Sequence, residues 1–136
     1  MDKPKIFIVD DEEDVRAKLK SYLSRHTECN VQEASNGREA LKILEKEYFD
    51  LILLDIKMPG ISGVDVLKKV KKIHPDTDVL VMTAYDSQQV AAETLKEGAT
   101  DYIPKPSTIE AIHTKIYEVL KKKNKYLPKE PKSKTY

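Results

Sequence analysis

The sequence has little of what extracellular or membrane-spanning proteins need. Its 136 residues include one cysteine, Cys29, so the chain cannot form an internal disulfide. No apolar run is long enough to cross a bilayer, and the first residues lack the charged, apolar and small-residue order of a signal peptide. We therefore expect a reducing, cytoplasmic setting with no membrane contact.

A strong excess of charge of one sign is also missing from the chain as a whole, whose net charge is +1. The charge is unevenly distributed, because residues 121–136 contain seven lysines and one glutamate, which leaves a net charge of −5 on residues 1–120. The apolar periodicity stops near Lys123, and two prolines follow in the lysine-rich run. With a hydrophobic content of 40%, this predicts one globular domain over residues 1–123 and a basic flexible tail or linker over residues 124–136.

Short apolar segments alternate with longer amphipathic ones, which predicts strands and helices in strict alternation. The five expected strands are Lys5–Val9, Asn30–Ala34, Leu51–Asp55, Asp78–Thr83 and Asp101–Pro104. The five expected helices are roughly Asp14–Arg25, Arg38–Glu47, Val64–Ile73, Gln88–Glu97 and Thr108–Lys123. Expected capping side chains, each three residues before an acid or amide, are Asn36, Ser62, Asp86 and Ser107. The order predicts an α/β domain with a mostly parallel sheet and right-handed crossovers.

Polar side chains stand where the expected strands end, and in a parallel sheet those ends share the edge at which ligands bind. The first strand is followed by Asp10 and Asp11, the third ends in Asp55, the fourth ends in Thr83, and Lys105 follows the fifth. Three carboxylates so close together repel, by about 1 to 4 kcal/mol for each pair, and therefore call for a divalent cation. Oxygen ligands alone favour Mg²⁺, with Mn²⁺ as a substitute.

Four segments resemble, in order and spacing, the signature segments of the CheY-like response-regulator receiver domain of two-component signalling. They are IVDDEEDVR, LILLDIKMPGISG, VLVMTAYD and GATDYIPKP. The resemblance covers about residues 4–123. It implies a flavodoxin-like, doubly wound sheet of five parallel strands in the order 2-1-3-4-5, with five helices in a single domain.

The resemblance also implies a role for each carboxylate. Asp55 would be the phosphoacceptor, which takes a phosphoryl group from a histidine of a sensor kinase or of a phosphotransfer protein. Asp11 and Asp55 would bind Mg²⁺ directly, together with the backbone carbonyl of Lys57. Asp10 would act mainly through a metal-bound water. An ionised aspartate is a usable oxygen nucleophile, so its chemistry agrees with this role.

The remaining implied roles concern the phosphoryl group and the switch. Lys105 would pair with the phosphoryl oxygens, and Thr83 would turn its hydroxyl toward them. Tyr102 would move inward with Thr83 and reshape the surface of the fourth helix, fifth strand and fifth helix, where an unknown output partner or domain binds. The bond between Lys105 and Pro106 is usually cis in the family.

We therefore expect a phosphorylation-controlled signalling domain, not a turnover enzyme, that catalyses only its own aspartyl phosphorylation and dephosphorylation. It would stand alone or be part of a longer regulator, and dimerisation on phosphorylation is a further implied interaction. The tail lysines lack interleaved aromatic residues, so we expect no nucleic-acid binding by this chain alone.

Three other functions are open to the same fold. An aspartyl-phosphate phosphatase would need a second acid two residues after the nucleophile, where this chain has Lys57. A flavodoxin-like cofactor binder would need a loop rich in glycine, serine and threonine after the first strand, where this chain has DDEED. A degenerate receiver would act as a phosphorylation-independent binding module. Such a protein would lack some of the site residues, whereas this chain has Asp10, Asp11, Asp55, Thr83 and Lys105.

Ordinary structural roles also remain open for the candidate residues. Asp10 and Asp11 could cap the first helix, Thr83 and Tyr102 could be simple strand residues, and Lys105 could be a solvated surface lysine. The histidines lack metal-ligand spacing, so we expect them on the surface near helix ends or on polar faces. They are His26, His74 and His113.

Overall fold

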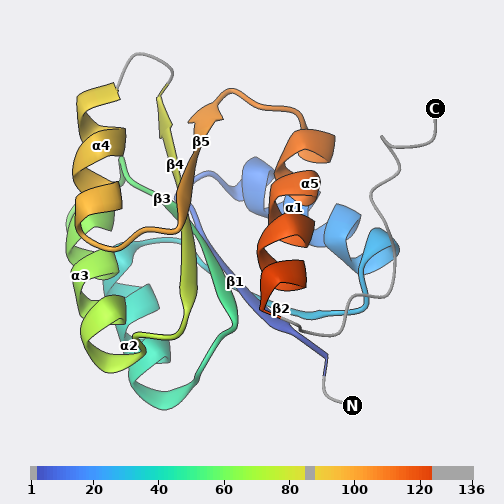
Figure 1. The fold of residues 1–136 in the computed structure, drawn as a ribbon, viewed down its shortest axis with the longest axis horizontal. Coiled ribbons are helices and arrows are strands. Elements are labelled where there is room, and N and C mark those ends of the chain that lie inside the picture. The colour runs from blue at the N-terminus through green and yellow to red at the C-terminus, as the bar shows by residue number, and fades with distance from the viewer. Residues whose placement is uncertain (1–2, 85–87, 124–136) are drawn as a thin grey trace.

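The chain folds into a central sheet covered by helices on both faces (Figure 1). The computed structural model describes residues 3–84 and 88–123. The strands are β1 (Lys5–Val9), β2 (Asn30–Ala34), β3 (Leu51–Asp55), β4 (Asp78–Ala84) and β5 (Asp101–Lys105). The helices are α1 (Glu13–His26), α2 (Gly37–Lys46), α3 (Gly63–Ile73), α4 (Gln88–Lys96) and α5 (Ile109–Lys122). Every predicted element is present, with ends within one residue of those expected.

The sheet has the predicted order β2-β1-β3-β4-β5, and all neighbouring strands are parallel. Helices α1 and α5 cover one face, while α2, α3 and α4 cover the other (Figure 1). The predicted flavodoxin-like α/β fold is therefore confirmed. The chain order reverses at β1 and β3, so the loops after these two strands diverge and leave room between them for a ligand.

The core is divided by the sheet into two layers, because successive strand side chains point to opposite faces. Phe7 and Ile52 pack into one layer, together with α2 and α3. Ile8 and Leu53 pack into the other, with α1 and α5. Strand β3 is buried along its whole length, so Asp55 reaches the sheet edge at the end of a fully buried strand.

Two of the predicted helix caps are confirmed and one is wrong. Asn36 and Ser62 accept hydrogen bonds from the backbone N–H three residues later. The cap of α5 is Thr108, not Ser107, because the Ser107 hydroxyl instead donates to the carbonyl of Pro104. Asp86 lies outside the described residues. The Lys105–Pro106 bond is cis, as expected.

The expectation that all three histidines lie on the surface is wrong for His113. Its side chain is 2% exposed between α5 and α1, with Nε2 in a 2.8 Å hydrogen bond to the Thr27 hydroxyl. Tyr22 packs edge-on against its ring, and His26 is the neighbouring titratable group on α1. Burial, assisted by the His26 charge, lowers the pKa of His113. His113 lies on the buried face of α5, whose other buried residues are apolar. The polarity of histidine alone led to the expectation of a surface position.

Acidification should therefore destabilise the fold through His113. Below about pH 6.5 the unfolded chain binds a proton at this histidine that the folded chain resists, so unfolding becomes easier as the pH falls, by up to about 1.4 kcal/mol per pH unit. Denaturant titrations of His113→Gln between pH 5 and 7.5 should show a shallower loss than wild type. His74→Gln serves as the control, and an equal change of slope in both variants would contradict the prediction.

The carboxyl end of α5 is fixed at the edge of the sheet opposite the strand ends that carry the aspartates. Lys123 Nζ donates to the backbone carbonyls of Asp50 and Asp76 at 3.2 and 2.7 Å, and pairs with Asp78 at 3.3 Å. The predicted tail, residues 124–136, lies outside the described residues, so the domain boundary stays a prediction. Among residues 3–84 and 88–123, we find no helix with the length and apolarity of a bilayer span.

Candidate functional site

The candidate site lies at the carboxyl edge of the sheet, where four strands deliver polar side chains. Asp10 and Asp11 follow β1, Asp55 ends β3, Thr83 lies near the end of β4, and Lys105 ends β5. The parallel register brings these ends level, because Val9 is paired with Leu54 and Ala84 with Lys105. The fold thus gathers at one edge the residues that the sequence analysis singled out.

The three aspartates form a cluster that suits a divalent cation. Each can contribute one oxygen, and these oxygens lie within 4.8 Å of one another. Asp10 and Asp55 are buried, whereas Asp11 is exposed at the mouth of the site. A buried pair of carboxylates with an open third side is a donor set for Mg²⁺ or Mn²⁺, which bind oxygen ligands and retain water.

Lys105 partly neutralises this cluster in the absence of a metal. Its Nζ lies 3.0 Å from an oxygen of Asp10 and 3.4 Å from an oxygen of Asp55. Burial lowers the pKa of Lys105, but the hydrogen bond to Asp10 and the charge of Asp55 outweigh this effect and raise it. The ammonium is therefore charged at neutral pH and bridges the first and third strands.

Ionisation of the Asp55 carboxyl group is energetically costly in the folded protein. Burial raises its pKa to about 6, the Lys105 charge opposes the rise, and the Asp10 charge adds to it. One carboxylate oxygen accepts a 3.3 Å hydrogen bond from the backbone N–H of Lys57. A buried carboxylate that is ionised near neutral pH, but poorly solvated, is a reactive oxygen nucleophile.

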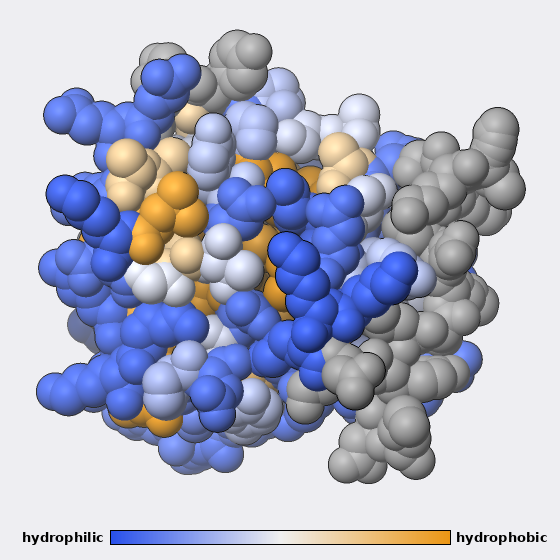
Figure 2. Space-filling model, viewed as in Figure 1, coloured by the Kyte–Doolittle hydropathy of each residue, from blue (hydrophilic) through white to orange (hydrophobic). Residues whose placement is uncertain are grey.

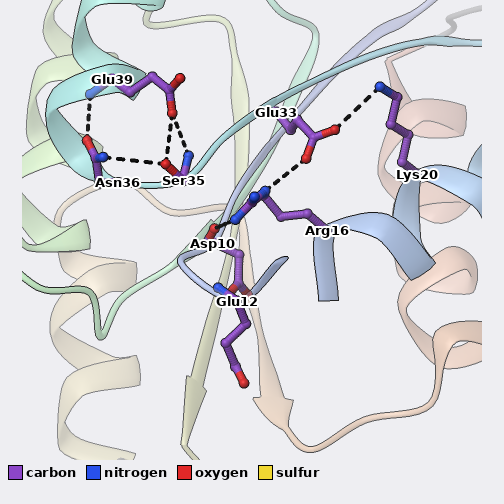
Figure 3. Close-up of polar contacts among 8 residues, drawn as sticks. All are labelled: Asp10, Glu12, Arg16, Lys20, Glu33, Ser35, Asn36 and Glu39. Atoms are coloured by element: carbon purple, nitrogen blue, oxygen red, sulfur yellow. Dashed lines mark hydrogen bonds and ion pairs between the residues drawn. The ribbon is translucent and has the colours of Figure 1, made fainter. Parts of the chain in front are cut away.

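Two further residues contact Asp10 or its partner Lys105, and sequence reasoning missed both. Arg16 of α1 donates to the backbone carbonyl of Asp10 at 2.8 Å and to the Glu33 carboxylate of β2 at 2.8 Å (Figure 3). The Arg16 hydrogen bond lowers the pKa of Glu33. The second residue is Glu12, whose carboxylate lies 3.3 Å from Lys105 Nζ. A signal was available, since Glu12 directly follows the aspartate pair and Arg16 lies in the first turns of the helix after it.

The loop after β3 leaves the sheet directly beyond Asp55. Gly60 adopts a φ of 80°, which favours glycine, and turns the chain away from the sheet. At Gly63 a Cβ atom would lie 2.5 Å from the Asp55 carbonyl oxygen, so only glycine permits α3 to begin this close to the strand. A cleft of about 810 Å³ opens beside Asp11, which lines it together with Asn36 and Gly60, whereas Asp10 and Asp55 do not line it.

The two predicted switch residues occupy different environments. Thr83 is buried, with 6% of its surface exposed, beside the carboxyl end of β3. Tyr102 lies on the edge strand β5, is 38% exposed, and is paired with Val81, two residues before Thr83. Tyr102 and Thr83 therefore lie on adjacent strands and two residues apart in register.

Comparisons with known proteins agree with this geometry. The family model described as the response regulator receiver domain matches residues 6–117. Sporulation initiation phosphotransferase F of Bacillus subtilis (strain 168) is 37% identical over 124 residues, which are 91% of this chain and 94% of that protein. Response regulator protein PilR of Pseudomonas aeruginosa is 36% identical, also over 91% of this chain, but the chain spans only 28% of its length.

Solved structures show the same similarity. A CheY-like receiver domain protein from Methanospirillum hungatei JF-1 has a TM-score of 0.84 and 32% sequence identity, over 90% of this chain and 97% of that one. The receiver domain of the Francisella response regulator 1452 has a TM-score of 0.81 and 28% identity, over 89% of this chain and 99% of that one.

Proposed function

The chain belongs to the response regulator receiver domain family of two-component systems, and on that premise we propose that it accepts a phosphoryl group on Asp55. The donor is a histidine of a sensor kinase or phosphotransfer protein. The observation that supports this most directly is the position of Asp55, buried beside Asp10 and 3.4 Å from Lys105, in a cluster with the exposed Asp11. Receiver domains are signalling domains. In this proposal the domain catalyses only its own phosphorylation and dephosphorylation.

The chemistry follows from the charges of these side chains. An oxygen of the Asp55 carboxylate forms a bond to phosphorus, while the phosphorus–nitrogen bond to the donor histidine breaks and its electron pair leaves with the imidazole nitrogen. Lys105 stands 3.4 Å from Asp55 and places a positive charge where the phosphoryl oxygens arrive. The product is an acyl phosphate, which water can later hydrolyse.

The acidic cluster completes this role by holding Mg²⁺, with Mn²⁺ as a substitute. Asp11 and Asp55 would be direct ligands together with the backbone carbonyl of Lys57, and Asp10 would act through a bound water. The cation supplies charge neutralisation for the phosphoryl oxygens. It also favours the ionised form of Asp55, whose pKa burial raises to about 6.

Phosphorylation would be read on the surface formed by α4, β5 and α5. In this proposal Thr83 turns toward the phosphoryl group and Tyr102 follows it inward. Figure 2 shows hydrophobic colour over α4 within a mostly hydrophilic face, and Leu95 of α4 and Tyr102 are 41% and 38% exposed. In this proposal these two side chains contact an output partner, an output domain or a second phosphorylated copy.

The proposed function predicts Mg²⁺-dependent phosphorylation of a single site. Incubation with Mg²⁺ and a small acyl-phosphate donor should add one phosphoryl group to the intact mass, and omission of Mg²⁺ should slow the addition by at least about tenfold. Asp55→Asn should add none. No addition to the wild type, or the same addition to Asp55→Asn, would overturn the proposal.

A further inference from the structure

Lys105 has a third carboxylate partner that the proposed reaction does not use. Its Nζ lies 3.3 Å from Glu12, a distance between those to Asp10 and Asp55. Asp10 and Asp55 approach Lys105 from the buried side of the site, whereas the Glu12 side chain is 63% exposed. Glu12 therefore approaches the ammonium from solvent, the side from which a phosphoryl donor must arrive.

The backbone fixes Glu12 at the mouth of the site. Its N–H donates to the Asp10 carboxylate at 2.8 Å, and its carbonyl accepts from the N–H of Arg16 at 3.2 Å. Glu12 precedes the first residue of α1, but its side chain makes no capping hydrogen bond to that helix. The side chain is therefore not needed to start the helix.

The direction of the side chain is also specific. Glu12 and Arg16 are four residues apart at the start of a helix, a spacing that commonly forms an ion pair. Figure 3 shows instead that Glu12 points away from Arg16, which is occupied by Glu33 and by the carbonyl of Asp10. With Arg16 occupied elsewhere, Glu12 pairs with Lys105.

We propose that Glu12 is a positioning residue that holds Lys105 on the solvent side and competes with the incoming phosphoryl group for its charge. This rests on the proposed function of Asp55. The Glu12 carboxylate must release Lys105 before the ammonium can pair with phosphoryl oxygens, and its own charge repels an anionic donor. Glu12 thus slows phosphorylation by anionic donors. The rate with Glu12 in place is lower than the rate that the same site would reach without this charge.

Glu12→Gln should accelerate phosphorylation. The pair is partly exposed and screened by solvent, so we expect an increase of about threefold in the rate constant with a dianionic acyl-phosphate donor at low ionic strength. The increase should shrink toward onefold near 1 M salt, where the screening length is about 3 Å. The measurement is intact mass against time, with Mg²⁺, over a range of donor concentrations.

Glu13→Gln is the matched control, because it removes the same charge from the next residue in the chain. The Glu13 side chain is exposed in the first turn of α1. Its rate should stay within about 1.5-fold of wild type. A second test uses Lys105→Met: if Glu12 acts through Lys105, then Glu12→Gln should add less than about 1.5-fold in that background.

Three results would overturn the proposal while leaving the proposed function intact: equal acceleration in Glu12→Gln and Glu13→Gln, no acceleration in Glu12→Gln, or undiminished acceleration without Lys105. The first two results require that wild type is phosphorylated, and the third also requires a measurable rate in Lys105→Met. A wild type that takes up no phosphoryl group would overturn both proposals together, so the two failures are distinguishable.

Discussion

Replacing Asp55 with asparagine should raise the free energy of unfolding of the metal-free protein, by up to about 3 kcal/mol at pH 7. The cause is the cost of keeping this carboxylate ionised, since burial raises its pKa to about 6 from an ordinary value of 3.8. Asparagine has nearly the same shape but no charge, so the folded state no longer bears this cost. Lys105 keeps Asp10 as a partner at 3.0 Å.

The pH dependence of this gain has a definite sign. Between about pH 4 and pH 6 the folded wild type binds more protons at Asp55 than the unfolded chain does, so the contribution of this group to stability falls as the pH rises. The difference between Asp55→Asn and wild type should therefore be small near pH 4 and reach its full size above pH 6. Denaturant titrations across this range measure it directly.

Asp50→Asn provides the control for loss of a buried aspartate. Asp50 is 8% exposed at the opposite edge of the sheet, and its carboxylate accepts a 2.8 Å hydrogen bond from the backbone N–H of Lys5. This variant should be no more stable than wild type. Mg²⁺ should raise the free energy of unfolding of wild type more than that of Asp55→Asn. A bound cation stabilises the folded state, and the variant lacks the Asp55 carboxylate that would bind it. Equal stability of Asp55→Asn and wild type would contradict the prediction.

The sequence predicts the architecture of this protein well because its pattern is locally consistent. Strands β1, β3 and β4 are continuous apolar runs, which is the pattern of strands covered on both faces, and their ends are marked by polar residues. Parallel pairing then places those polar ends on one edge. This is why the sequence alone groups Asp10, Asp55 and Lys105 at one edge.

What the sequence could not predict depends on the directions of individual side chains. Glu12 could pair with Arg16 or with Lys105, and only the packing of Arg16 against β2 decides between them. His113 is polar by type but occupies a buried position because Thr27, 86 residues away, supplies a hydrogen-bond partner. Such contacts depend on elements far apart in the chain, for which local periodicity carries no information.

Lys105→Met should have the opposite effect to Asp55→Asn and lower the free energy of unfolding of the metal-free protein by about 3 kcal/mol at pH 7. Asp10 is fully buried and Asp55 is 4% exposed, and Lys105 contacts both. Methionine retains most of the apolar stem but leaves two buried carboxylates facing each other. The Lys105 side chain is 26% exposed. We therefore expect a loss of stability near the lower end of the range for breaking a buried ion pair.

Lys115→Met is the matched control, since its Nζ also lies 3.0 Å from an aspartate, Asp101, but both side chains are more than a third exposed. It should cost less than about 1 kcal/mol, the usual value of a surface pair. The loss in Lys105→Met should shrink toward pH 5, where Asp55, whose pKa burial raises to about 6, can take up a proton. It should also shrink on addition of Mg²⁺, which replaces the missing charge. The double variant Asp55→Asn/Lys105→Met should recover part of the stability, because one of the two carboxylates is then neutral. Equal losses in Lys105→Met and Lys115→Met, or a loss in Lys105→Met that neither acid nor Mg²⁺ relieves, would show that Lys105 stabilises the fold by packing and not by balancing the charges of Asp10 and Asp55.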